Sequence, residues 1–330
     1  MRAVLFGFGA VGRRVANELL TGDGVESLVV LHRDPSRVRR LTEGLGARVS
    51  LRSPDLELPA GTDVVVIAAP DVAAGVAAAA VHAGAHVIAA TAEVSDVRAL
   101  RALDGAARDQ RRTIAVGTTM APGLSCVLAV WAARHLDRVE QVHVAAFGTG
   151  GPACARRHHA SLSAPSIDWY DGAWRRRPGG SGRELVWFPE PVGGADCYRA
   201  RLADPPLLVP AFPGVQRVTS RMAATRRDRL TAPLPMLRPP HPEGTVGATR
   251  VELRGWKDGE AVAPVVGGVG RPAIIAATVT AVAARWAVTG RLARPGAAGL
   301  AELVGDPAGF LREVAGRGIA LSEFAGAAAA

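Results

Sequence analysis

The sequence predicts an α/β fold of two domains: a Rossmann domain with a doubly wound parallel sheet, then an α+β domain with a mainly antiparallel or mixed sheet. A glycine-rich turn joins the first strand to the first helix, and strands and helices then alternate as far as residue 122. From residue 123 onward, several short strands follow one another without helices between them. The 330 residues exceed the ~250–300 at which single cores stop growing, so we expect domains at 1–122 and 123–270.

The first strand, residues 3–6, ends in the motif Gly-x-Gly-x-x-Gly, and apolar residues at helical spacing follow it. Gly7 permits a tight turn, Gly9 lets the backbone approach a pyrophosphate, and Gly12 lets the helix pack closely on the strand. The N–H groups and the partial positive charge of the helix N-terminus favour phosphate there. The alternative is a glycine-rich turn without a ligand. We predict that a dinucleotide binds along Gly7, Phe8, Gly9, Ala10, Val11 and Gly12.

The end of the second strand, residues 27–31, indicates which dinucleotide binds. An acidic residue about 20 positions after the glycines favours NAD, because it bonds the ribose 2′-hydroxyl. Here His32 occupies that place, and Arg33 and Arg37 offer guanidinium groups that can hold a 2′-phosphate. The pattern therefore favours NADP(H). In the alternative, the arginines face solvent and Asp34 turns inward to serve NAD(H).

The remaining segments complete the expected order of elements. Small residues end the third and fourth strands, so Ala69, Pro70 and Thr91 are expected to border the nicotinamide half of the cofactor. In the first domain we expect strands at 63–69, 85–90 and 113–116 and helices at 72–83 and 96–109. In the second domain we expect strands at 139–147, 184–188 and 246–253, a helix at 124–136 and a long apolar helix at 273–289.

Composition excludes several classes of function. The formal charge is +9, but the arginines are scattered and no nucleic-acid-binding motif accompanies them, so we expect no nucleic-acid partner. An anionic cofactor and a carboxylate-bearing small molecule account better for the positive charge. No segment has the length and apolarity of a membrane helix, and the chain enters a strand at once, leaving no room for a signal peptide. Three cysteines without metal-ligand spacing indicate free thiols, no metal and a cytoplasmic location.

Two groups are candidates for the chemistry. His158 and His159 follow Arg156 and Arg157 after a glycine-rich turn, where an arginine suits a carboxylate and a histidine can move a proton. The alternative is an exposed basic loop. Glu93, just beyond the strand at 85–90, is placed to contact the nicotinamide ribose or a substrate amine. Its alternative is a carboxylate that only stabilises a helix N-terminus.

The chain resembles the saccharopine dehydrogenase-like oxidoreductases. The resemblance is carried by the loop at 7–12, by the Pro-Gly-Leu-Ser crossing within 119–125, and by the tail at 306–311 with Arg-Gly-Ile at 317–319. It is weakest over 150–245, where the substrate would be selected. The resemblance implies a Rossmann domain completed by about 271–330, a mixed-sheet second domain and a homodimer. It also implies hydride transfer at the C–N bond of an imine or secondary amine.

The expected function is therefore that of an NADP(H)-dependent oxidoreductase acting on a C–N bond of a small carboxylated substrate. Two alternatives remain open at this stage. One is an NADPH-dependent reductase of C=C or C=O bonds in specialised metabolism, because the middle of the chain matches the family poorly. The other is a non-catalytic sensor that binds a dinucleotide without turnover.

Overall fold

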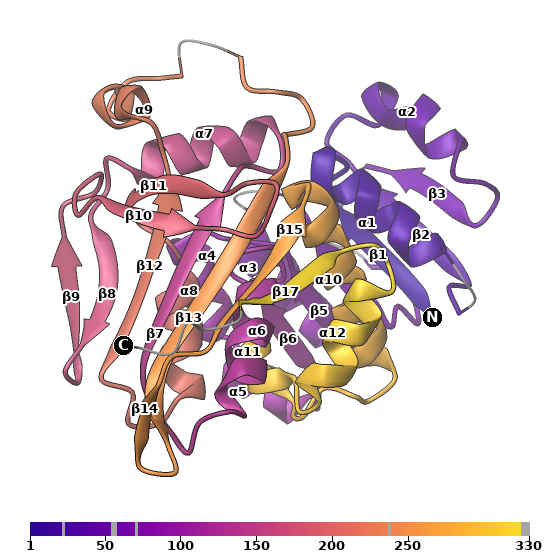
Figure 1. Ribbon diagram of the computed structural model, residues 1–330. Helices are drawn as coiled ribbons and strands as arrows, with labels where there is room; N and C mark the ends of the chain where they lie inside the picture. Colours follow the sequence, from indigo (N-terminus) through magenta and orange to yellow (C-terminus); the bar gives the residue numbers. More distant parts are fainter. Residues whose placement is uncertain (22–23, 54–57, 70–71, 237–238, 325–330) are drawn as a thin grey trace.

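The computed structural model describes residues 1–21, 24–53, 58–69, 72–236 and 239–324, and it confirms the expected fold class (Figure 1). Within these residues a seven-stranded parallel sheet has the order β16-β6-β5-β4-β1-β2-β3. Its strands are β1 (Arg2–Phe6), β2 (Ser27–Leu31), β3 (Val49–Arg52), β4 (Val64–Ile67), β5 (His86–Ala89), β6 (Thr113–Val116) and β16 (Gly296–Gly299). The helices of the same half are α1 (Ala10–Leu20), α2 (Pro35–Glu43), α3 (Ala73–His82), α4 (Val94–Arg101), α5 (Asp104–Asp109), α10 (Pro272–Val288), α11 (Leu300–Leu303) and α12 (Pro307–Ala315).

A second, mixed sheet forms the other half, and it lies to the left of the indigo strands in Figure 1. Strands β7 and β12 pair in parallel at its centre, and the other pairings are antiparallel. Its strands are β7 (Arg138–Phe147), β8 (Ser166–Tyr170), β9 (Ala173–Arg177), β10 (Glu184–Trp187), β11 (Gly194–Arg199), β12 (Arg217–Ala223), β13 (Gly247–Lys257), β14 (Glu260–Val262), β15 (Val265–Gly270) and β17 (Ala320–Phe324). Its helices are α6 (Leu124–Ala133), α7 (Pro152–Ser161), α8 (Asp204–Leu208), the 3₁₀ turn η1 (Val209–Ala211) and α9 (Arg226–Thr231).

The last part of the chain contributes to both sheets. Helix α10 is buried along nearly its whole length, as expected for so apolar a segment, and packs on α1, β4 and β5. Strand β16 then extends the parallel sheet beside β6, whereas β17 pairs with β15 in the mixed sheet. The C-terminal segment therefore joins the two halves covalently at their edges.

Two strands of the parallel sheet were not expected from the sequence. Strand β3 is short and half polar, because it lies at the edge of the sheet. Strand β16 has the sequence Gly-Ala-Ala-Gly, which carries no β-propensity. Its small residues are needed for packing, since a Cβ on Gly299 would lie 3.1 Å from Cβ of Leu207 in α8. Tertiary contacts, rather than local preference, make this segment a strand.

The turn from β1 to α1 provides a test of the fold. A Cβ on Gly12 would lie 2.1 Å from the carbonyl oxygen of Gly7, whereas a Cβ on Gly9 would meet nothing within 4 Å. We expect Gly12→Ala to lower the free energy of unfolding by about 1–3 kcal/mol, because the helix must move off the strand. Gly9→Ala is the matched control and should unfold like the wild type in urea. Equal stability of the two variants would contradict this packing.

Candidate active site

The glycine loop fits the pyrophosphate of a dinucleotide. Gly7 has φ of +92° and its N–H donates to the carbonyl oxygen of Leu31 at 3.1 Å, which ties the loop to the end of β2. Gly9 is the N-cap of α1, no side chain caps the helix, and no acidic residue lies in its first turn. Open space at Gly9 and uncapped N–H groups are what an anion needs at a helix N-terminus.

At the end of β2, Asp34 is already engaged locally. Its carboxylate accepts a hydrogen bond from Ser36 Oγ at the start of α2, and its backbone lies against the His32 ring, with Nδ1 2.8 Å from Asp34 O. Arg33 is exposed beside them. The side chain of Arg37 and the whole of Pro70 lie outside the described residues.

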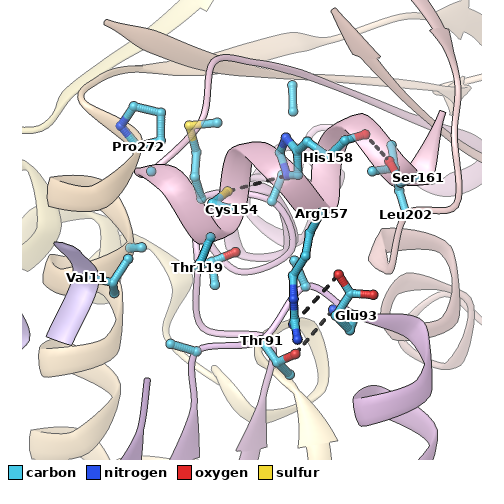
Figure 2. Close-up of a pocket in the computed structure, with 18 of the residues that line it drawn as sticks. Val11, Thr91, Glu93, Thr119, Cys154, Arg157, His158, Ser161, Leu202 and Pro272 are labelled. Atoms are coloured by element: carbon cyan, nitrogen blue, oxygen red, sulfur yellow. Dashed lines mark hydrogen bonds and ion pairs between the residues drawn. The ribbon is translucent and has the colours of Figure 1, made fainter. Parts of the chain in front are cut away.

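A cavity of about 170 Å³ lies at the carboxyl edge of the parallel sheet, where α7 of the second half covers it (Figure 2). Val11, Ala69 and Thr91, all expected beside the cofactor, line it. The wall from the parallel-sheet half also includes Ala68, Ala90, Ala92, Glu93, Asp96, Pro272 and Ala276. The other lining residues are Thr119, Met120, Ala121, Ala146, Gly148, Gly150, Ala153, Cys154, Arg157, His158, Ser161, Arg201 and Leu202.

An ion pair crosses the cavity between the two halves. Arg157 points from α7 toward the end of β5, where its Nη1 lies 3.8 Å from Glu93 Oε1 (Figure 2). The backbone N–H of Glu93 donates to Thr91 Oγ1 at 3.2 Å, and Thr91 Oγ1 donates to Asp96 Oδ2 at 2.8 Å. Glu93 is the N-cap of α4 but makes no side-chain cap bond. Its carboxylate therefore faces the cavity and a cation rather than the helix.

The two expected histidines do not lie together. The basic segment forms helix α7 rather than an exposed loop, and this separates the rings of consecutive residues. His158 lines the cavity. His159 is buried elsewhere, with Nε2 2.9 Å from Thr231 O and 3.2 Å from Leu234 O, and it is not among the described residues that line the cavity. His158 alone of the pair stays a candidate for proton transfer.

Cys154 is a site residue that the sequence reasoning missed. Its Sγ lies 3.7 Å from His158 Nε2, one helical turn away on α7. The available signal was the i, i+4 spacing of cysteine and histidine, which brings two side chains together only in a helix. Without apolar periodicity in this polar segment, the helix itself was not evident.

A buried carboxylate lies behind the cavity. Asp204 is 1% exposed, and it accepts hydrogen bonds from Ser125 Oγ at 2.6 Å and from Ser220 Oγ at 3.3 Å. Burial raises the pKa of Asp204 to about 6, although the two hydroxyl groups and the charge of His158 oppose this shift. Ser125 follows the Pro-Gly-Leu crossing into α6, so the crossing positions this carboxylate.

Elsewhere, no group of histidine, cysteine or acidic side chains suited to a metal ion is found among the described residues. Among the same residues, no helix is long and apolar enough to cross a membrane.

The pH dependence of stability tests the burial of Asp204. Its folded-state pKa lies above its ordinary value of 3.8, so this group costs stability as pH rises through about 6. Asp204→Asn removes the titration. Between about pH 5 and about pH 7.5, we therefore expect the wild type to lose about 1 kcal/mol of unfolding free energy relative to Asp204→Asn. Urea titrations of both proteins at the two pH values measure this loss. A difference that stays constant over this range would show that Asp204 titrates normally.

Comparison with known proteins gives matches in structure but not in sequence. No family model matches the chain, and no curated protein matches it. Saccharopine dehydrogenase (L-Glu forming) from Saccharomyces cerevisiae superposes with a TM-score of 0.75 at 14% identity, covering 98% of this chain and 100% of that one. DAP dehydrogenase of C. glutamicum, solved with DAP, and an engineered D-amino acid dehydrogenase bound to NADP⁺ each give 0.51 at 15% identity, covering 93% of this chain and 95% of theirs. The chain therefore has the fold of saccharopine dehydrogenase.

Proposed function

We propose that this protein is an NADP(H)-dependent oxidoreductase that transfers a hydride to or from a C–N bond of a small carboxylated substrate. The observation that carries the proposal is the composition of the cavity. Val11 of the dinucleotide motif lines one side, and Arg157 and His158 of the second half line the other (Figure 2). Ligands of doubly wound sheets bind at this carboxyl edge. A substrate in the cavity would meet the nucleotide and ionisable side chains together.

The preference for NADP(H) rests on the end of β2. The Asp34 carboxylate accepts a hydrogen bond from Ser36, whereas Arg33 is exposed just beyond the end of β2, at the same edge of the sheet as the glycine loop. A guanidinium group can hold a 2′-phosphate by two hydrogen bonds. The engineered D-amino acid dehydrogenase, which superposes on this chain, is bound to NADP⁺. That complex supports NADP(H) as the cofactor proposed here.

The substrate carboxylate would be held by the arginines of the cavity. Arg157 lines the cavity and forms an ion pair with Glu93 at 3.8 Å. Arg201 is exposed at the cavity and makes no ion pair with a described residue. An imine formed from an amine and an oxo acid carries the anion that these two cations would bind.

The chain's own residues would manage the proton and exclude water. When bound, the nicotinamide ring supplies or accepts the hydride. His158 would give a proton to the substrate nitrogen as an imine is reduced, or take it in the reverse direction. Ser161 Oγ donates to the carbonyl oxygen of His158 at 2.7 Å, and this hydrogen bond stabilises the last turn of α7, which carries the His158 ring. The homodimer and the cytoplasmic location stay predictions.

Cofactor preference is the first test. In calorimetric titrations we expect the wild type to bind NADPH more tightly than NADH, and Arg33→Ala to weaken NADPH binding by about tenfold or more while NADH binding changes little. The reason is that Arg33 would contact only the 2′-phosphate. Equal binding of the two nucleotides by the wild type would remove this role from Arg33 and favour Asp34.

Two further variants distinguish a specific contact between Arg33 and the 2′-phosphate from a general effect of positive charge. Arg176→Ala removes the same charge from the exposed strand β9 and should bind both nucleotides as the wild type does. Gly9→Ala adds a Cβ in the open space of the loop and should weaken NADPH and NADH alike. If neither nucleotide binds the wild type, the enzyme hypothesis fails as a whole.

Assays of NADPH oxidation test which bond of the substrate is reduced. We expect NADPH absorbance to fall when an amine and an oxo acid are supplied together, and not with either alone, because the imine forms from both. His158→Gln should lower kcat by about tenfold to a thousandfold while the Kd for NADPH is kept, as for loss of a general acid. NADPH oxidation by a carbonyl or enoyl compound alone would favour the reductase of C=O or C=C bonds. Tight binding without any turnover would favour the sensor.

A further inference from the structure

The cavity contains a thiol and an imidazole that face each other. Cys154 and His158 both line it, and a dashed line in Figure 2 joins their side chains, with Sγ and Nε2 3.7 Å apart. The chain's other two cysteines, Cys126 and Cys197, are fully buried and do not line the cavity. Cys154 is therefore the thiol that a molecule bound in the cavity would meet.

The surroundings of this pair favour the charged form of both groups. Cys154 lies in the first turn of α7, which begins after Gly151 and contains no acidic residue in that turn, so the partial positive charge of the helix N-terminus favours a thiolate there. Burial opposes a thiolate, yet His158 and a backbone hydrogen bond from Gly150 outweigh it and lower the pKa of Cys154. By contrast, burial raises the pKa of Cys126 and of Cys197 to about 12.

The imidazole is biased in the complementary direction. Burial disfavours an imidazolium, but the pKa of His158 is raised by Cys154 and by the carboxylates of Glu93 and Asp204. Glu93 comes from the loop after β5 and Asp204 from α8, so the charges that act on the ring come from three elements. A thiolate beside an imidazolium is the usual state of cysteine nucleophiles in enzymes.

We propose that Cys154 is a nucleophile that binds the carbonyl carbon of an aldehyde covalently, with His158 as its proton partner. The sulfur forms a bond to the carbonyl carbon, the π electrons of C=O pass to oxygen, and the imidazolium proton moves to that oxygen. A hemithioacetal results, both side chains become neutral, and no electrons are exchanged with a cofactor. Arg157 and Arg201 line the same cavity, so the aldehyde carries a carboxylate.

This inference deepens the proposed function, on which it rests for the identity of the carbonyl partner. It assigns an aldehyde rather than a ketone to that partner, because thiols add readily to the less crowded carbonyl carbon. The adduct would hold the aldehyde carbon in the cavity and prevent its hydration until the amine arrives. The covalent step itself needs no nucleotide, so it can be tested apart from hydride transfer.

Alkylation of the full-length protein without nucleotide tests the nucleophile. With iodoacetamide at neutral pH and mass-spectrometric assignment, we expect Cys154 to react at least about tenfold faster than Cys126 and Cys197. His158→Gln should slow the reaction of Cys154 by about tenfold or more. His159→Gln is the matched control on the same helix, away from the cavity, and should change that rate by less than about twofold. A rate insensitive to His158→Gln would overturn the pairing.

Protection by aldehydes tests the covalent bond and needs no variant. Glyoxylate and 4-oxobutanoate should each be assayed for slowing the alkylation of Cys154 in the wild type, with glycolate and 4-hydroxybutanoate as alcohol controls of the same length. Protection by at least one aldehyde but not by its alcohol supports the adduct. If neither aldehyde protects, or if the alcohols protect equally, the covalent site is refuted even where His158→Gln fails to fold.

The two proposals fail in different ways. Absence of NADPH binding, with Cys154 still protected by an aldehyde, would refute the reductase and keep the covalent site. Normal turnover of amine and oxo acid with an unreactive Cys154 would refute the covalent site and keep the reductase.

Discussion

The close packing of Gly12 on the carbonyl of Gly7 is the constraint on which the rest of the site depends. A Cβ on Gly12 would lie 2.1 Å from Gly7 O, and one on Gly7 would lie 2.7 Å from Ala68 O. Strand β1, helix α1 and the end of β4 therefore meet backbone to backbone. Because no side chain intervenes, the N-terminus of α1 is placed at the cavity by main-chain geometry, with its first-turn N–H groups uncapped.

The second half of the molecule is held to the same point. A Cβ on Gly151, the N-cap of α7, would lie 2.8 Å from Cβ of Ala10, so α7 begins beside the start of α1. Glu243 strengthens this junction by accepting hydrogen bonds from Arg13 at 3.2 Å and Arg14 at 2.6 Å. Two helix N-termini thus converge on one cavity. Their partial positive charges suit two anionic groups at once, a pyrophosphate and a substrate carboxylate.

The sequence was most informative where one local rule determines structure. Residues 27–31 and 113–116 form strands as expected, and the glycine loop stands between β1 and α1. It was least informative where contacts distant in sequence decide. The segment Gly296–Gly299 is a strand because β6 pairs with it and Leu207 packs on it. The spacing of the cysteines indicates neither a metal site nor a disulfide, and a Cys–His pair one turn apart becomes visible only when residues 152–161 are known to be helical.

In the folded chain, some of the arginines have structural roles that the composition alone does not show. Arg285 donates to the carbonyl oxygens of Glu18, Leu19 and Thr21 and so caps the C-terminal end of α1, while Arg291 lies 3.8 Å from the centroid of the Trp286 ring. A guanidinium has five donors and a flat face, so it suits both tasks better than a compact ammonium does. These two arginines thus stabilise the end of a helix and the position of an aromatic ring. Arg33 beyond β2 and Arg201 at the cavity are exposed at the two ends of the site, where they would suit the proposed anionic cofactor and carboxylate-bearing substrate.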